Sequence, residues 1–424
     1  MNHGRGDPAA ERYIMRYTFT LVILASLLIT LPLRAQDDEE NIYASRYIGD
    51  GVSVREPSYK DEFYPININN SWGYANQKGD VTMFPKYDWT DMPHGGAMRI
   101  IVGGRTGYID TDGNWIIQPI YHWADHFEEG IAIISNGKTF GYTNRFGKII
   151  AEMTFDGALR CREGLAAFQV GSRIGYINPA GKIIIEPQFI EARSFYEGFA
   201  VVRESDYRNK GRYGYINRKG EFAFVNENNQ FAELGCFSDS IAPAKVGDKW
   251  GFIDREFKIA IEPTYEEVRL LRGGLAAVKL NGKWGYINKK GEMIIKPAYD
   301  LAYDFDEVLA MVKIGGKLGF IDRSGNMVIK PQFDTAEPFL YDAARVSQSP
   351  NFGYIDIEGK IIWDPRGPLG GFNRISGQPR KELPRKRSQT KIPYQPNYTY
   401  VDKLPRQTEE STKRSSRSRR RNRR

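Results

Sequence analysis

The residues best suited to chemistry lie in Tyr121–Phe127, which reads YHWADHF. His122 and His126 flank Asp125, and on a helix this spacing would place both imidazoles on one face, as a metal site requires. The segment aligns, however, with a loop before a strand in another part of the chain, where Tyr299–Phe305 reads YDLAYDF. We therefore interpret it as a structural loop and predict no metal site.

The other reactive residue types offer little support for catalysis. His3 lies near the N-terminus, and His94 stands alone in a loop rich in Pro and Gly. Cys161 and Cys236 are 75 residues apart with no histidine close in sequence, which argues against nucleophilic catalysis and favours free, buried thiols over a disulfide. The sequence has no glycine-rich phosphate loop and no nucleophile elbow. We predict no catalytic residue and no cofactor.

Oxygen-bearing side chains recur at one position of a repeated motif. They are Asp110, Asn144, Asn178, Asn217, Asp254, Asn288, Asp322 and Asp356. Such a ladder could bind Ca²⁺ or sugar hydroxyls. Asn and Asp also begin tight turns by bonding to their own backbone, and we favour that interpretation. Glu163 and Glu197, which each precede a glycine, are interpreted as turn formers too.

The positions of nine glycines predict the fold. Each is followed by Tyr or Phe and, two residues after that, by Asn or Asp; they are Gly73, Gly107, Gly141, Gly175, Gly214, Gly251, Gly285, Gly319 and Gly353. Their spacings are 34, 34, 34, 39, 37, 34, 34 and 34 residues. A helical array of this period needs two uninterrupted helices per unit, whereas here a Gly or Pro falls every few residues. The repeat therefore predicts an all-β chain.

Each repeat is expected to contain about three short antiparallel strands. In the unit Lys283–Asp300, an apolar stretch leads through a turn ending at Gly291 into Met293–Ile295, which stops at Pro297 because proline cannot continue a ladder. A third run follows a loop, as at Glu197–Val202. Units of this size cannot bury an apolar face alone, so neighbouring units must stack.

These motifs resemble the WG (KWG) repeat family, with nine repeats over about residues 67–365. The resemblance implies a repetitive β architecture and no shared catalytic residue set. The tryptophan of the name stands only at Trp72, Trp250 and Trp284, which favours a packing role for that position. We predict an open solenoid, superhelical or loosely curled, with a closed propeller-like ring as the alternative.

Two further features follow from an open array. Its ends would need caps, and the atypical first unit (Ala75, Val81–Phe84) and last unit (Ile361–Pro365) fit that role. The longer units hold insertions at Glu204–Arg212 and Val225–Glu233, which are expected to project from one face as tolerated surface loops or as part of a binding side.

Composition and charge separate the termini from the middle. With 41% hydrophobic and 13% aromatic residues and two cysteines, the chain is neither wholly disordered nor a disulfide scaffold. The net charge is +8 overall, +14 in residues 366–424 and +2 in residues 1–35, which leaves −8 for residues 36–365. The pI of about 9.1 therefore reflects a basic tail on an acidic body.

The N-terminus has the features of a secretory signal peptide. An uncharged apolar run, Tyr17–Leu33, follows Arg12 and Arg16 and ends before a small residue, Ala35. The run is short for a transmembrane anchor, which needs roughly 20 apolar residues. We expect cleavage after Ala35 and export to a bacterial periplasm or cell surface, with no transmembrane helix in the mature chain.

The domain organisation and function follow from these points. We predict a signal peptide (1–35), a leader to the array (36–66), the WG-repeat β array (67–365) and a disordered basic tail (366–424). The function expected is a non-catalytic binding or scaffold module for a protein or a cell-envelope polymer. The Arg-rich tail should bind an envelope polyanion, nucleic acid being an unlikely partner of an exported protein. The alternative is a carbohydrate-active enzyme or glycan-binding protein built on the array.

Overall fold

Short antiparallel strands form almost all of the regular structure. The computed structural model describes residues 63–76, 78–94, 96–204, 211–305, 308–340, 342–348 and 351–363. The chain divides into two units, Met1–Asp50 and Gly51–Arg424, and every described residue lies in the second. The expected signal peptide and basic tail lie outside the described residues.

The strands form nine sheets within the described residues, and strand order in each sheet follows the chain. Sheet 1 contains β1 (Tyr64–Ile68), β2 (Ser71–Ala75) and β3 (Val81–Tyr87); sheet 2 contains β4 (Trp89–Thr90), β5 (Met98–Val102), β6 (Arg105–Ile109) and β7 (Trp115–Tyr121); sheet 3 contains β8 (Trp123–Ala124), β9 (Ile131–Ser135), β10 (Phe140–Asn144) and β11 (Ile149–Phe155). Sheet 4 contains β12 (Gly157–Ala158), β13 (Ala166–Val170), β14 (Arg173–Ile177) and β15 (Ile183–Phe189); sheet 5 contains β16 (Glu191–Ala192), β17 (Ala200–Arg203), β18 (Tyr213–Ile216) and β19 (Phe222–Val225); sheet 6 contains β20 (Glu233–Leu234), β21 (Ala242–Val246), β22 (Lys249–Ile253) and β23 (Ile259–Tyr265). Sheet 7 contains β24 (Glu267–Val268), β25 (Leu275–Leu280), β26 (Lys283–Asn288) and β27 (Met293–Tyr299); sheet 8 contains β28 (Leu301–Phe305), β29 (Ala310–Ile314), β30 (Lys317–Ile321) and β31 (Met327–Phe333); sheet 9 contains β32 (Thr335–Ala336), β33 (Ala343–Gln348), β34 (Asn351–Asp356) and β35 (Ile361–Trp363).

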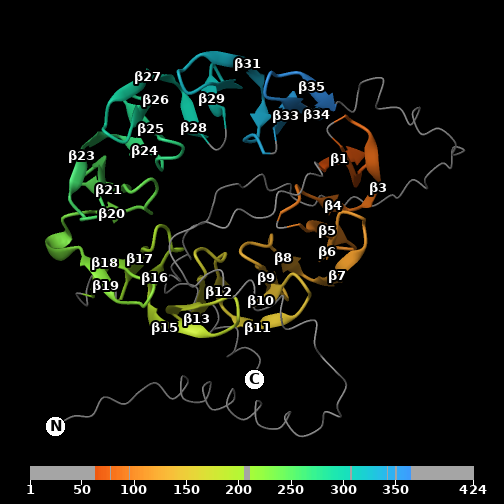
Figure 1. Ribbon diagram of the computed structural model, residues 1–424, viewed down its shortest axis with the longest axis horizontal. Coiled ribbons are helices and arrows are strands. Elements are labelled where there is room, and N and C mark those ends of the chain that lie inside the picture. Colours follow the sequence, from red (N-terminus) through yellow and green to blue (C-terminus); the bar gives the residue numbers. More distant parts are fainter. Residues whose placement is uncertain are drawn as a thin grey trace, which may run out of the picture. The chain divides into compact units, whose positions relative to one another are not determined.

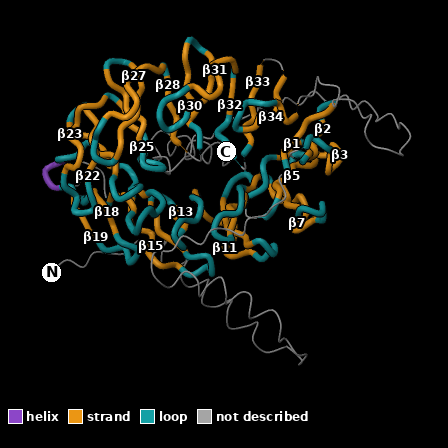
Figure 2. Tube along the Cα trace, turned by 45° about the horizontal axis from the view of Figure 1, so that its top comes forward, coloured by secondary structure: helices purple, strands orange, loops and turns teal. Residues whose placement is uncertain are grey.

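The all-β prediction is confirmed, but the expected three strands per repeat are wrong for sheets 2–9, which have four. The additional strand is usually two residues long, as in β12, too short to show an alternation of apolar and polar residues. It lies on the inside of the ring of sheets, and the long fourth strand lies on the outside (Figure 1). The one 3-10 turn among the described residues, Glu227–Asn229, stands out in Figure 2.

The fourth strand continues through its proline, contrary to the expectation that Pro297 ends it. Strand β27 spans Met293–Tyr299 and pairs with β26, with register shifts on both sides of Tyr286. Three residues of the outer strand, 296–298, thus face the single residue Gly285. A proline is tolerated there because the strand is an edge strand with a bulge, where no ladder hydrogen bond is lost.

The apolar core is divided among the joints between consecutive sheets. The described residues form nine buried clusters, and each combines side chains of neighbouring sheets. An open row of nine sheets has eight joints. The ninth cluster contains Tyr64 and Ile66 of sheet 1 together with Ala343, Tyr354 and Trp363 of sheet 9. The sheets therefore close into a ring, as Figure 1 shows.

The closing contact corrects two expectations. Tyr354 donates a hydrogen bond from its hydroxyl to the carbonyl oxygen of Pro65 at 2.9 Å, and the rings of Trp72 and Phe352 stack with centroids 5.7 Å apart. The open array is therefore wrong, and the propeller-like ring given as the alternative is the observed fold. The first and last units are not solvent-facing caps, because each covers the apolar face of the other.

A buried tyrosine hydroxyl joins most sheets to the next. The tyrosine after the repeat glycine donates to a carbonyl oxygen seventeen to twenty residues further on, in the following sheet. The bonds are Tyr74 to Asp91 (2.9 Å), Tyr108 to Asp125, Tyr142 to Leu159 (2.8 Å), Tyr176 to Arg193 (2.7 Å), Tyr215 to Gly235 (2.7 Å) and Tyr286 to Tyr303 (2.7 Å). Tyr354 makes the corresponding bond across the closure of the ring.

Replacing Tyr354 by Phe tests ring closure. Loss of the hydroxyl leaves the buried carbonyl of Pro65 without its donor, so we expect a loss of about 1–3 kcal/mol in the free energy of unfolding. The Tyr176→Phe variant, in the middle of the chain, is the matched control and should lose a similar amount. Urea denaturation measures both. In an open array the Tyr354 hydroxyl would face solvent, and its removal would leave stability unchanged.

Candidate functional site

The repeat glycines lie where two strands approach too closely for a side chain. A Cβ built on Gly285 would be 2.4 Å from the carbonyl oxygen of Ile295 and 2.7 Å from the nitrogen of Pro297, both backbone atoms. Equivalent carbonyl oxygens lie 2.0–2.6 Å from a Cβ built on Gly73, Gly107, Gly141, Gly175, Gly214, Gly251 and Gly319. Gly353 occupies the same position in β34, opposite Val346. These glycines thus allow the bulge of the outer strand.

The tryptophans next to these glycines pack against neighbouring side chains. Trp284 is buried, and the guanidinium of Arg269 lies 5.6 Å from its ring centroid. Trp250 is half-buried with the Nζ of Lys245 at 5.5 Å, and Trp72 takes part in ring closure. Their contacts are thus with the protein's own side chains, which fits the packing role favoured from the sequence.

The turn interpretation of the Asn and Asp ladder is confirmed. Asn178 accepts hydrogen bonds at its Oδ1 from the backbone N–H groups of Ala180 (3.1 Å) and Lys182 (2.9 Å). Asp254 and Asp322 accept corresponding pairs of backbone bonds. Their oxygens are therefore engaged in turns, and no group of metal-ligating residues occurs in the described ranges.

The connections after the first and third strands of each four-stranded sheet leave from one end, because antiparallel strands alternate in direction. We call this end the loop face. The connection after the first strand, for example residues 159–165, contains the Glu–Gly pair. The insertions Glu204–Arg212 and Val225–Glu233 lie at the opposite end, since they follow the second and fourth strands of sheet 5.

The second insertion exposes residues 227–230 and is held at its base by buried residues. Phe231 is 1% exposed, and the Asn226 side chain accepts from its N–H (3.0 Å) and donates to its carbonyl oxygen (2.7 Å). Residues 205–210 of the first insertion lie outside the described ranges.

The loop face of sheets 2–4 holds a cluster of ionisable side chains that departs from the repeat pattern. Asp91 and Asp125 occupy the position just after the first strand, where sheet 4 has Leu159. Arg99 on β5 binds Asp91 through Nε at 2.9 Å and through Nη2, and donates from Nη1 to the carbonyl oxygen of Ala124 at 2.9 Å. A comparable acid–arginine pair, Glu337 with Arg345, recurs in sheet 9.

Arginines of sheet 4 complete this cluster. Arg160 holds both carboxylate oxygens of Asp125, with Nε to Oδ2 at 2.6 Å and Nη2 to Oδ1 at 2.8 Å. Arg162 pairs with Glu128 at 2.5 Å. Each pair joins sheet 4 to sheet 3, while Arg99 joins sheet 2 to sheet 3. The cluster therefore ties three consecutive sheets together at the loop face.

Burial controls the protonation of the acids. It raises the pKa of Asp91 to about 6, although the neighbouring Arg99 lowers it. Burial also raises the pKa of Glu128 to about 7 against the opposing effect of Arg162. The Oδ1 of Asp91 is buried and has no hydrogen-bond partner among the described residues. Both acids therefore titrate close to neutral pH.

The histidines meet in a combination that the sequence did not indicate. His126 lies against His94 of sheet 2, with ring centroids 4.3 Å apart, whereas His122 is exposed. The His122–His126 pair considered for a metal is thus not assembled, and His94 does not stand alone. Burial lowers the pKa of His94 to about 4 and that of His126 well below its usual value. The 3.3 Å contact from the Nε2 of His126 to Asp91 therefore involves a neutral imidazole.

The acids before the glycines do more than form turns. Glu129 accepts hydrogen bonds from the backbone N–H groups of Glu163 (2.8 Å) and Gly164 (2.7 Å) in the next sheet. The Sγ of Cys161 also donates to Glu129, at 3.3 Å. Cys161 and Cys236 are both buried. The repeat spacing of the Glu–Gly pair was the available signal for this contact, but only closely stacked sheets reveal its partner.

Comparisons with known proteins identify the repeat. A family model described as "WG containing repeat" matches residues 107–139, 140–173, 174–207, 250–284, 284–317 and 319–349. The chain is a WG-repeat protein. Curated protein sequences gave no match. In the described part of this WG-repeat protein, no helix is both long enough and apolar enough to cross a bilayer.

Solved structures resemble the WG-repeat ring at low sequence identity. A crystal structure of the eukaryotic initiation factor is 12% identical, with a TM-score of 0.54 covering 72% of this chain and 96% of the other. This likeness concerns the fold alone. Apo AztD from Citrobacter koseri (12% identity, 63% and 90% covered, TM-score 0.38) and BamB from Moraxella catarrhalis (10% identity, 74% and 96% covered, TM-score 0.36) overlap less closely.

Replacing Gly285 by Ala tests the close approach of the strands. Because the added Cβ would meet backbone atoms that cannot rotate away, we expect the free energy of unfolding to fall by about 1–3 kcal/mol or more. Lys289→Ala, in the exposed turn that follows the same strand, is the control and should change stability by less than about 0.5 kcal/mol. Equal urea midpoints for the two variants would contradict the packing argument.

The cluster makes stability depend on pH in two opposite ways. The pKa of Glu128 is higher in the folded than in the unfolded chain, so this group stabilises the fold progressively as pH falls from about 7 towards its ordinary pKa near 4.5. The lowered pKa of His94 has the reverse effect, with stability lost as pH falls below about 6.5 towards 4.

Two variants separate these contributions. Urea denaturation between pH 7.5 and 5 should show less gain on acidification for Glu128→Gln than for the parent protein, and more gain for His94→Asn. Parallel pH profiles for all three proteins would show that neither group has a shifted pKa.

Proposed function

We propose that this WG-repeat protein is an exported, non-catalytic binding module that holds a partner protein at the loop face of its ring. The observation that carries the proposal is the ionic cluster of sheets 2–4. Structural turns repeat with the same chemistry around the ring, whereas this cluster concentrates different side chains at one place on one face. A local departure from repeat symmetry is what a specific binding surface requires, because identical units would offer the same contacts everywhere.

The pairing within the cluster supports binding over catalysis. Arg160 holds Asp125 in a bidentate pair, which fixes the orientation of the carboxylate. His94 and His126 lie against each other, and burial lowers the pKa of both, which makes each imidazole a weak general base. These groups hold three loops in fixed positions, and a fixed loop surface loses little conformational entropy when a partner binds.

The termini support the cellular context of the proposal. The leader ending at Ala35 has the features of a signal peptide, and residues 366–424 carry a net charge of +14. A tail of this charge would attract anionic envelope polymers in a salt-dependent manner. The tail would thus bring the ring to an anionic surface, while the loop face recognises the partner.

Carbohydrate chemistry is the second candidate, and one observation favours it. Asp91 and Glu128 are carboxyl groups with pKa values raised by burial, which is a property of the general acid in glycoside hydrolysis. Hydrolysis of a glycan panel by the purified protein, abolished in both Asp91→Asn and Glu128→Gln while folding is retained, would establish this function in place of ours.

Site-specific photocrosslinking tests the binding module. A photoreactive residue at Arg218 or Arg255, both exposed on the loop face, should capture one partner protein in living cells. The matched controls carry the same residue at Lys138 or Asp248, which are exposed turns at the opposite end of the sheets. We expect the partner from the loop face alone, with and without residues 366–424. Equal capture from both ends, or capture that disappears with the tail, would contradict the proposal.

A further inference from the structure

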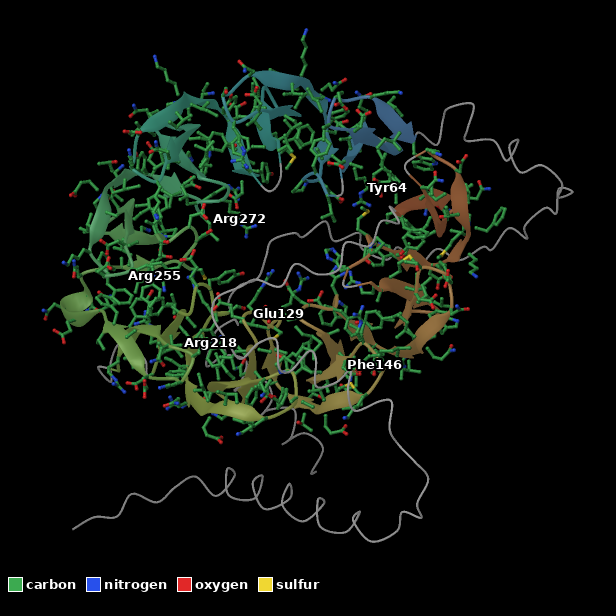
Figure 3. The ribbon with its side chains drawn as sticks, viewed as in Figure 1. Tyr64, Glu129, Phe146, Arg218, Arg255 and Arg272 are labelled. Atoms are coloured by element: carbon green, nitrogen blue, oxygen red, sulfur yellow. The ribbon has the colours of Figure 1, made fainter. Side chains whose placement is uncertain are left out.

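Carboxylates link the loop-face turns of consecutive sheets in a series. Glu129 binds the turn of sheet 4, Glu163 binds the N–H of Gly198 in sheet 5 at 2.8 Å, and Glu197 binds that of Ser240 in sheet 6 at 3.1 Å. Asp239 binds the N–H of Gly274 in sheet 7 at 3.1 Å. Four turns of one backbone type therefore each bind a carboxylate from the sheet before. Figure 3 shows Glu129 at the inner side of the ring.

The turn of sheet 3 has the same backbone conformation. Its residues Glu129 and Gly130 have φ angles of 50° and 85°, compared with 53° and 74° for Glu163 and Gly164. The N–H of Glu128 donates to the carbonyl oxygen of Ile131 at 2.9 Å. The equivalent turns contain the same bond, from a backbone N–H to the carbonyl oxygen of the apolar residue three positions later. Consecutive N–H groups in such left-handed turns form a concave donor for anions.

The preceding sheet supplies no carboxylate for this turn. In the sequence, the position of Glu129 corresponds one repeat earlier to Gly95, and glycine has no side chain. Within the described ranges, no carboxylate accepts from the N–H groups of Glu129 or Gly130. The donor geometry that binds a carboxylate in four other sheets is thus present in sheet 3 without an internal acid to satisfy it.

A proline stands beside this turn where the next sheet supplies an arginine to three equivalent turns. The Nη2 of Arg218 lies 3.2 Å from a Cβ built on Gly164 in sheet 4, Arg255 donates to the carbonyl oxygen of Glu197 in sheet 5, and Arg323 lies over Gly273 in sheet 7. The corresponding residue beside sheet 3 is Pro179, and a Cβ built on Gly130 meets no atom within 4 Å, as at Gly198 and Gly274. Glu129 and Gly130 are half-buried, so their N–H groups lie at the rim of the ionic cluster and within reach of a ligand.

We infer that the Glu129–Gly130 turn binds a carboxylate from outside the ring, namely an aspartate or glutamate side chain of the partner protein. The inference deepens the proposed function, on which it rests, by naming one chemical group that the loop face recognises. Two backbone hydrogen bonds to a charged acceptor are a modest interaction. Such a contact suits one anchor within a protein interface better than the capture of a free organic acid.

Two peptides test the carboxylate preference on the unmodified protein. N-acetyl-Glu-Gly-amide should shift the backbone amide resonances of Glu129 and Gly130 in heteronuclear NMR spectra, because it repeats the internal contact. N-acetyl-Gln-Gly-amide should bind about tenfold more weakly, since it lacks the charge. The amides of Glu163 and Gly164, already bound to Glu129, serve as internal controls. Acetate as a third probe separates recognition of any carboxylate from recognition of a peptide acid.

Gly95→Glu is the matched variant, because it supplies the acid that sheets 3–5 already carry at this position. We expect it to abolish the peptide-induced shifts and to raise the melting temperature. Undiminished peptide binding by Gly95→Glu, or equal shifts from the Glu and Gln peptides, would overturn the inference. The peptide comparison does not depend on how the variant folds.

Photocrosslinking distinguishes this inference from the function on which it rests. If Gly95→Glu retains the loop-face partner at the parental yield, the carboxylate site is wrong and the binding module stands. If the parent protein captures no partner at the loop face, the proposed function fails, whatever the peptides do.

Discussion

Seven of the nine joints in the described ring contain a hydrogen bond from a buried tyrosine to the backbone of the next sheet, and sheets 6 and 8 carry Phe252 and Phe320 in its place. A sheet of four short strands cannot hide its apolar faces, so each joint must exclude water while satisfying the polar groups that it buries. The tyrosine does both, because its ring fills the joint and its hydroxyl meets a carbonyl oxygen. Tyr176 is an example, with its ring packed edge-on to Phe195 and its hydroxyl on Arg193.

The glycine before each tyrosine makes this joint possible. It lets the outer strand bulge towards the middle strand, and the bulge allows proline in a strand that would otherwise expose a regular edge. Edge strands invite pairing with other chains, and a bulge with proline is one way in which proteins prevent this. The same short motif thus serves packing within a sheet, contact between sheets and protection of the outer edge.

The sequence predicted the repeat units of the array well and the closure of the ring poorly. The spacing of Gly107, Gly141 and Gly175 is a local signal, and it identified the repeat, the turns and the absence of helices. Closure depends on the angle between neighbouring sheets, which no residue encodes by itself, so the last unit, ending Ile361–Pro365, was interpreted as a cap. The two-residue strands were missed because their length falls below any detectable alternation of apolar and polar residues.

The candidate site was predictable only in part. Asp125 and His126 drew attention as a local motif, but their partners Arg99 and Arg160 belong to other sheets and lie up to 35 residues away in sequence. At the position of Arg99, sheet 3 carries the aliphatic Ile133, a substitution that a comparison of the repeats could have detected. The acids before the glycines were seen as turn residues because their ligands, backbone amides of the next sheet, have no sequence signature.

Ring closure also determines where the basic tail is attached. Trp363, the last described residue, lies in β35 and shares a buried cluster with Tyr64 of sheet 1. The tail therefore follows the joint that closes the ring, from a strand that runs from the loop face towards the opposite end. An anion held by the tail would reach the loop face only through a length of chain that spans the ring, and that length governs its effective concentration there. A circular permutant, in which residues 363 and 63 are joined and the chain is cut between two other sheets, would preserve the joints between sheets. It would move the tail to another sheet, so the attachment point of the tail and the recognition surface at the loop face can be varied independently.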